Sequence, residues 1–261
     1  NDPLSRFRRL FYLLIEKSTI WMSDMIISVG VDTLNHYEVR NIGKKIRSQV
    51  IYSGIDTDRF IKPGFTTDDI LKLKKKLNII SGDIVLINVG RFSFSKAQRY
   101  IIESFARLTE KTNNIKLLLI GEGELQELCR EQCRELGIED QVVFYGFSDN
   151  IPLMMKLGDI FVLTSLREGL PRVVVEASLS RLPVVAFEVE GISEIITHGR
   201  SGYIVPQYDV KQFLEKTTDL IQNVQLRNKF ANEAFKHVVK KWDYRKMVEQ
   251  IRRIYNDSMD E

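Results

Sequence analysis

Length, composition and charge limit what this chain can do. It has 261 residues, of which 44% are hydrophobic and 28% are charged, and a net charge of +3. These values are typical of a globular chain with one large domain, or one domain with an appendage. No apolar run reaches the roughly eighteen residues of a membrane span, no secretory signal is visible, and no stripe of basic and aromatic side chains suggests a nucleic-acid partner.

The first 56 residues differ in pattern from the rest. Residues 10–22 predict an amphipathic helix, 24–30 a strand, 32–41 a second helix and 46–54 a second strand. The chain also opens without a methionine. We therefore expect a piece of a longer protein, in which residues 1–56 are the end of a preceding domain and the start of a linker.

The N-terminal helix carries Arg6, Arg8 and Arg9 among large apolar side chains. One interpretation is peripheral contact with an anionic membrane surface, and the other is packing against the missing part of the preceding domain. Elsewhere, Cys129 and Cys133 lie four apart on a predicted helix, and the histidines are scattered singly. We interpret the cysteines as reduced thiols rather than metal ligands, which predicts a cytoplasmic location, on the inner face of the membrane if the first interpretation holds.

From residue 84 onward, short apolar runs alternate with helix-like stretches. Continuous apolar runs rich in Val and Ile are typical of strands buried on both faces of a parallel sheet. Alternation with helices then predicts a doubly wound α/β domain with right-handed crossovers. Helix-like stretches and a closing helix with Trp242, Tyr244 and Tyr255, which we expect to pack in the core, follow Val205. The predicted strands are residues 84–90, 115–123, 141–147, 159–165 and 183–189.

Ligands of open parallel sheets bind at the carboxyl ends of the strands, so the residues that follow each apolar run are the candidate site. Glycine follows most of these runs, as expected where a ligand approaches the backbone closely. The candidate segments are Gly90-Arg91, Gly121 to Gly123, Gly146-Phe147, Ser165 to Pro171 and Glu190-Gly191.

In "GRFSFSK", Arg91 leaves a predicted strand and Lys96 precedes a helix that we expect to begin near Ala97. Two cations beside a helix N-terminus favour a phosphate group, although two solvated surface cations would give the same pattern. In "GEGELQ", Gln126 replaces the third glycine of a dinucleotide fingerprint, which argues against NAD. A Walker A motif and a nucleophile elbow are also absent from the sequence.

In "LREGLPRVVVEA", Glu168 and Glu176 flank a turn, and Glu176 lies about 7.5 Å along the following helix from Pro171. Backbone N–H groups of Gly169 and Leu170 are expected to face the crevice at the strand ends. Two carboxylates so placed suit the hydroxyls of a sugar or ribose. Ordinary acids near a helix start, or the carboxylate pair of a glycoside hydrolase, remain alternatives. Phosphate-binding cations on the same rim favour a nucleotide-sugar over a plain glycoside.

Seven segments in this order resemble the donor-binding, C-terminal half of a family 4 retaining glycosyltransferase with the GT-B fold, from about residue 53 to 205. They are "SGID", "VGRFSFSK", "IGEGEL", "VVFYGF", "SLREGLPRVVVEA", "VEGISEII" and "GRSGYIV". The resemblance implies an acceptor-side domain remnant over residues 1–56, a Rossmann-like donor domain over 57–240 and a crossover helix over 241–261. It also implies transfer of a hexose with retention at the anomeric carbon.

By this resemblance, Arg91 and Lys96 hold the donor diphosphate, Glu168 binds the transferred sugar and Glu176 binds the ribose. The resemblance places Gly169 and Leu170, just before Pro171, at the sugar or its phosphate. It also assigns Gly90 and Gly121 to the donor site, and Gly146 and Phe147 to the base pocket.

The resemblance further implies a UDP- or GDP-linked donor, no metal or other cofactor, and a saccharide or lipid-linked acceptor in cell-surface polysaccharide or glycolipid synthesis. Two positions depart from the family: Ala97 stands where glycine is usual, and Glu190 where a paired glycine is frequent. Without the rest of the N-terminal domain, we expect donor binding but poor turnover. A non-catalytic sugar-nucleotide-binding module and a phosphorylase of the same fold remain alternatives.

Overall fold

The computed structural model describes residues 3–39 and 46–259. Its centre is a six-stranded, fully parallel sheet in the order β5-β4-β3-β6-β7-β8. The sequence prediction of a doubly wound α/β domain is confirmed. The strands are β3 (Ile84–Val89), β4 (Ile115–Ile120), β5 (Val142–Gly146), β6 (Ile160–Leu163), β7 (Val184–Phe187) and β8 (Gly202–Val205).

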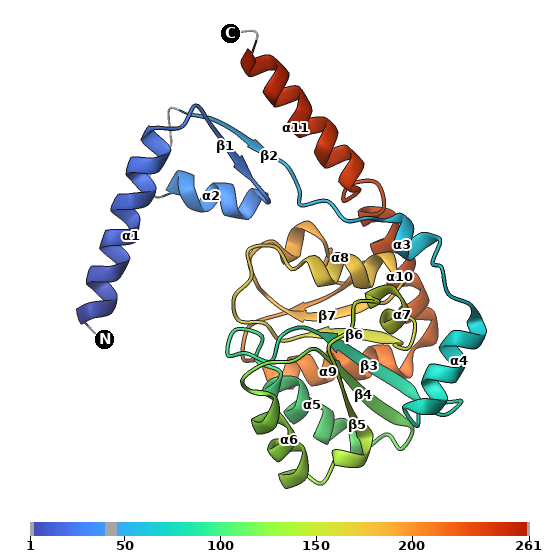
Figure 1. The fold of residues 1–261 in the computed structure, drawn as a ribbon. Helices are drawn as coiled ribbons and strands as arrows, with labels where there is room; N and C mark the ends of the chain where they lie inside the picture. Colours follow the sequence, from blue (N-terminus) through green and yellow to red (C-terminus); the bar gives the residue numbers. More distant parts are fainter. Residues whose placement is uncertain (1–2, 40–45, 260–261) are drawn as a thin grey trace.

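Helices cover both faces of this sheet (Figure 1). One face carries α7 (Ile151–Met155), α8 (Arg172–Leu179) and α10 (Val224–Val238), and the other carries α5 (Arg99–Thr109), α6 (Gln126–Glu135) and α9 (Val210–Gln222). Successive residues of one strand enter opposite cores: Val85 and Ile87 pack on the first face, and Leu86 packs on the second. Burial on both faces explains why these strands are continuous apolar runs.

The N-terminal part forms a separate small sheet. This part contains α1 (Pro3–Trp21), β1 (Met25–Ser28), α2 (Val31–Val39) and β2 (Arg47–Val50), and the small sheet is formed by β1 and β2, which pair in parallel. These four elements confirm the predicted helix–strand–helix–strand order. The side chains of Arg6, Arg8 and Arg9 lie outside the described part, so the membrane interpretation stays a prediction. Helices within residues 3–39 and 46–259 are all too short or too polar to cross a bilayer.

The connection between the two parts is more ordered than the linker expected from the sequence. It contains α3 (Asp58–Ile61) and α4 (Thr67–Lys76), which the sequence analysis missed. The α4 N-terminus has a capping box, in which Thr66 and Asp69 each accept a hydrogen bond from the other's backbone N–H. The domain boundaries at residues 56 and 240 stay predictions.

The end of the chain returns to this connection. Ile55 N–H donates to Trp242 O at 2.8 Å, and Tyr244 N–H donates to Ile55 O at 3.1 Å. Trp242 is fully buried against the ring of Tyr52, as predicted for a core residue. The same prediction is wrong for Tyr244 and Tyr255, which are 41% and 63% exposed. Both residues lie on α11 (Tyr244–Met259), which extends away from the main sheet (Figure 1). The helical spacing of these two tyrosines therefore did not indicate a buried helix face.

Candidate functional site

The carboxyl ends of β3, β4 and β5 are tied together through glycines. Gly90 N–H donates to Ile120 O at 2.9 Å, and Gly121 N–H donates to Gly146 O at 2.8 Å. Gly121 has a φ of +132°, and a Cβ there would lie 2.2 Å from Gly90 O. No side chain fits at Gly121, and with Gly90 and Gly146 none of the three strand ends carries a side chain of its own at these positions.

The loop after β3 carries the two predicted phosphate-binding cations. Arg91 is exposed, and its guanidinium lies 3.2 Å from a carboxylate oxygen of Glu124. The buried Gln98 donates from Nε2 to Arg91 O at 3.0 Å and fixes the loop from inside. Ala97 sits in the left-handed region with φ +49°, which explains why glycine is favoured there. The helix begins at Arg99, two residues later than expected.

Lys96 contacts Glu168, and this pair brings two distant motifs together. Lys96 Nζ lies 2.5 Å from Glu168 Oε1, although the residues are 72 positions apart in the chain. The side chains are 25% and 13% exposed, so the pair is partly shielded from water. The methylene stem of Lys96 lies over Gly90. The cation of the first motif and the first carboxylate of the second therefore share one place at the strand ends.

Two further hydrogen bonds lock the β3 and β6 loops to each other. Leu166 N–H donates to Ser95 O at 2.7 Å, and Thr164 Oγ1 donates to Ala97 O at 2.9 Å. From the other side, Gln207 Nε2 donates to Leu166 O at 3.0 Å. Sequence reasoning missed Gln98 and Gln207, since a lone glutamine gives no signal of whether its amide grips a loop.

The turn before α8 leaves backbone donors available. Gly169 is exposed, and the N–H groups of Gly169 and Leu170 have no acceptor within the described part of the chain. Pro171 is the residue immediately before α8 rather than in its first turn, a shift of one position from the prediction. Gly191, with φ +75°, packs against this turn, and a Cβ added to Gly191 would lie 2.8 Å from Gly169 O.

Glu176 lies on α8 between buried Val175 and Ala177. Burial raises the pKa of its carboxyl, while the charges of Arg172 and Arg59 oppose that rise. No hydrogen-bond partner of its carboxylate exists among the described residues, so its oxygens are free to accept. Glu176 and Glu168 thus differ: one is unpaired, and the other is held by Lys96.

The predicted base-side residues lie at the end of β5. Gly146 has φ +87°, and Phe147 is 73% exposed. Phe147 N–H donates to Glu122 Oε1 at 3.3 Å, which ties this loop to the segment that follows β4. The structure places both residues on the same edge as Gly90 and Gly121.

The turn with Glu190 and Gly191, where the sequence departs from the family pattern, contacts the N-terminal part of the chain. Gly191 N–H donates to Asp32 Oδ2 at 3.1 Å, and the carboxylate of Glu194 accepts from Val31 N–H at 3.0 Å and Asp32 N–H at 3.3 Å. A carboxylate at the N-terminus of α2 is favourably placed. This turn therefore connects the small N-terminal sheet with the Gly169–Leu170 turn.

Two buried thiols lie on α6, and Cys129 lines a cavity with Ser93 and Ala97 of the loop after β3. Cys129 and Cys133 are both buried and unbonded to each other, which agrees with the predicted reduced thiols. Within residues 3–39 and 46–259, no three His, Cys, Asp or Glu side chains cluster in a way that suits a metal ion. Whether the reaction needs a metal stays a prediction.

The comparison with known families decides the membership of this chain. The family model "Glycosyl transferases group 1" matches residues 69–237. The chain belongs to the group 1 glycosyltransferases. This membership confirms the coarse part of the resemblance, and it places the matched region on the sheet and helices that carry the candidate site.

Relatives of this group 1 chain are longer than it is. It is 29% identical over 241 residues to N-acetyl-alpha-D-glucosaminyl L-malate synthase of Bacillus anthracis, covering 91% of this chain and 61% of the relative. It is 25% identical over 274 residues to the capsular polysaccharide biosynthesis glycosyltransferase CapM of Staphylococcus aureus, covering 100% and 68%. The chain spans about a third to two thirds of the length of the curated relatives it matches.

Solved structures share the fold. Anabaena HepE, crystallised with UDP and glucose, superposes with a TM-score of 0.80 at 24% identity, covering 90% of this chain and 63% of that one. At this identity the likeness shows the fold alone. It supports the GT-B type of α/β architecture that the sequence predicts.

Proposed function

We propose that the protein is a family 4 retaining glycosyltransferase that moves a hexose from a UDP- or GDP-linked donor to a saccharide or lipid-linked acceptor. The proposal includes a role in cell-surface polysaccharide or glycolipid synthesis at a cytoplasmic or membrane-peripheral location. Membership in the group 1 family supports sugar transfer. The names of the relatives, a malate glycoside synthase and a capsular polysaccharide enzyme, show that acceptors vary among these proteins.

The observation that carries the proposal is the contact of Lys96 Nζ with Glu168 Oε1 at 2.5 Å. A nucleotide-sugar needs both charges side by side, because its diphosphate is anionic and the adjoining sugar presents hydroxyl groups. The glycines that follow β3 and β4, Gly90 and Gly121, let the diphosphate oxygens approach the backbone beside this pair.

Each residue then has a role in the transfer. The acceptor hydroxyl forms a bond to the anomeric carbon on the face from which the diphosphate leaves. Its proton passes to the departing diphosphate oxygen as the bond between that oxygen and the carbon breaks. Negative charge develops on the departing diphosphate, and Arg91 and Lys96 stabilise it. Glu168 and the N–H groups of Gly169 and Leu170 orient the sugar.

The nucleoside half of the donor lies farther along the edge in this proposal. Glu176 accepts hydrogen bonds from the ribose hydroxyls, and Gly146 with Phe147 lines the base site. Because the positive charges of Arg91 and Lys96 face the diphosphate in this proposal, we propose that no metal is required. Turnover that persists in excess EDTA supports this point, and complete loss that Mg²⁺ restores contradicts it.

Titration calorimetry of the 261-residue chain with UDP, GDP and their common sugar conjugates tests the donor class. We expect one nucleotide series to bind in the micromolar range and the other to bind more weakly. Retention is tested by proton NMR of the first sugar product released from an α-linked donor. An α product supports the proposal, and a β product contradicts it.

A further inference from the structure

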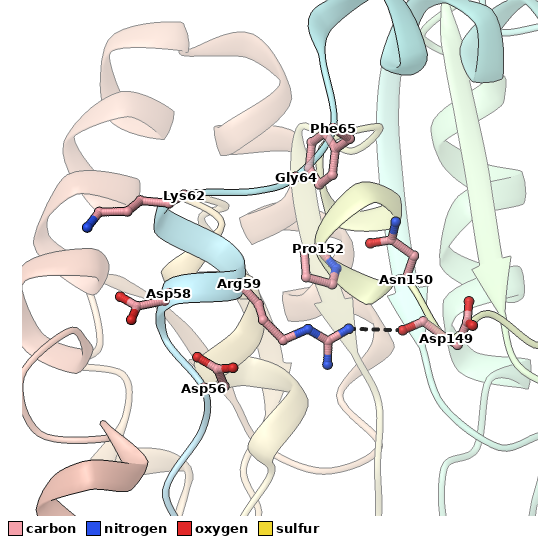
Figure 2. A pocket seen from close by; sticks show the side chains of 9 residues that line it. All are labelled: Asp56, Asp58, Arg59, Lys62, Gly64, Phe65, Asp149, Asn150 and Pro152. Carbon is pink, nitrogen blue, oxygen red and sulfur yellow. Dashed lines mark hydrogen bonds between the residues drawn. The ribbon is translucent and has the colours of Figure 1, made fainter.

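Arg59 connects the two segments to which the nucleoside half of the donor is assigned. It lies on α3, in the connection between the small N-terminal sheet and the main sheet. Its guanidinium Nη2 donates to Asp149 O at 3.3 Å (Figure 2). Asp149 belongs to the loop between β5 and α7, only two residues after Phe147. Arg59 therefore holds the backbone of the proposed base-side loop from a segment about ninety positions earlier in the chain.

Arg59 also influences Glu176, the residue assigned to the ribose, through its positive charge. The charged groups that influence the Glu176 carboxyl are Arg172, one turn earlier on α8, and Arg59, which reaches it from α3. Arg172 additionally donates to Gly54 O at 3.4 Å, so part of its hydrogen-bonding capacity is used in the connection. A positive charge near a largely buried carboxylate keeps it in the ionised form that accepts hydrogen bonds from hydroxyls.

Three acidic residues, Asp56, Asp58 and Asp149, line the same hollow as Arg59. Of these, Asp58 is paired with Arg245 at 2.9 Å, and Arg245 also bonds Asp243. Figure 2 shows Arg59 pointing across this hollow of about 570 Å³ toward Asp149 and Asn150. Lys62 lines the same hollow, but its side chain points away from Asp149 (Figure 2).

We propose that Arg59 is a positioning residue for the nucleoside half of the donor: it holds the 147–150 loop through Asp149 O and places a positive charge near the Glu176 carboxylate. This inference rests on the proposed function, because it assigns those two segments to base and ribose. Arg59 itself need not touch the donor.

The test is calorimetric titration of the 261-residue chain with UDP, GDP and inorganic pyrophosphate, for wild type, Arg59→Ala, Arg59→Lys and the control Lys62→Ala. We expect Arg59→Ala to weaken the nucleotide about five- to tenfold, the effect of one ordinary hydrogen bond, and to leave pyrophosphate unchanged. Lys62→Ala should bind as wild type does. Arg59→Lys keeps the charge and should recover part of the loss.

A pH series separates positioning from a general structural defect. Without Arg59 the Glu176 pKa rises further, so the pH at which nucleotide binding is half lost should move upward in Arg59→Ala and return in Arg59→Lys. Unchanged nucleotide affinity in Arg59→Ala, or equal weakening of nucleotide and pyrophosphate, would overturn the inference alone. A wild-type chain that binds neither nucleotide would overturn the proposed function, and the inference with it.

Discussion

Replacement of Lys96 by alanine removes the cation that faces both the diphosphate and Glu168. A charge-assisted hydrogen bond contributes about 1.5–3 kcal/mol, which corresponds to about 10- to 150-fold in affinity. Lys96 is already bonded to Glu168 at 2.5 Å, and exchanging one partner for another offsets part of that gain. We therefore expect Lys96→Ala to weaken UDP or GDP binding by about 10- to 30-fold.

The assay is titration calorimetry with the nucleoside diphosphate and the matching nucleoside. Affinity for the nucleoside should not change, because Lys96 is assigned to the phosphates. Lys116→Ala is the matched control, since Lys116 lies on β4 and donates to Asp140 O at 2.9 Å, away from the strand-end edge. Adding Glu168→Gln to Lys96→Ala should recover part of the loss by removing an unopposed carboxylate. Equal weakening of nucleoside and diphosphate would refute this reasoning.

Three further predictions concern stability and reactivity. Burial raises the pKa of Glu176, so the stability of the wild type falls as the pH rises above the ordinary glutamate range. Glu176→Gln should therefore have a higher melting temperature than wild type at pH 7 and the same melting temperature at pH 4. It should also bind nucleotide more weakly. Gly191 and Gly199 both have a positive φ, but only at Gly191 would an added Cβ also clash with Gly169 O. In urea unfolding, Gly191→Ala should cost about 2–4 kcal/mol of unfolding free energy and Gly199→Ala about 1 kcal/mol. Equal costs would contradict this prediction. Burial raises the thiol pKa of Cys129 to about 11 and of Cys133 to about 12, so both should resist DTNB at pH 8 until urea unfolds the chain.

Five of the six strands in the main sheet could be predicted from the sequence because they form apolar runs. The edge strand β8 (Gly202–Val205) was not predicted, since it is only four residues long and its two middle residues are only partly buried. An apolar run such as residues 84–89 has few alternatives, and its carboxyl end locates the candidate site. Helix α4 was missed because it buries none of its residues, although Thr66 and Asp69 carry the signal of a capping box. Tyr244 and Tyr255 were predicted to be buried but are exposed. Helical spacing shows that aromatic side chains share one face of a helix, but it does not show whether another element packs on that face.

The candidate site was predictable in its residues but not in its contacts. The motifs placed Lys96 and Glu168 after two predicted strands, but only the folded structure shows that these strands are neighbours and that the side chains meet. Arg59 lies outside every motif used to assign roles, and its contact with Asp149 spans ninety positions, so no local pattern indicates it. The contact of Gly191 with Asp32 depends in the same way on how the N-terminal part docks.

A crystal structure of the 261-residue chain grown with the nucleoside diphosphate that binds it, UDP or GDP, tests the central claim most directly. We predict that the diphosphate lies within hydrogen-bonding distance of Arg91 and Lys96, and that the ribose hydroxyls meet Glu176. A nucleotide bound on any other face, with none of these side chains in contact, would contradict the account.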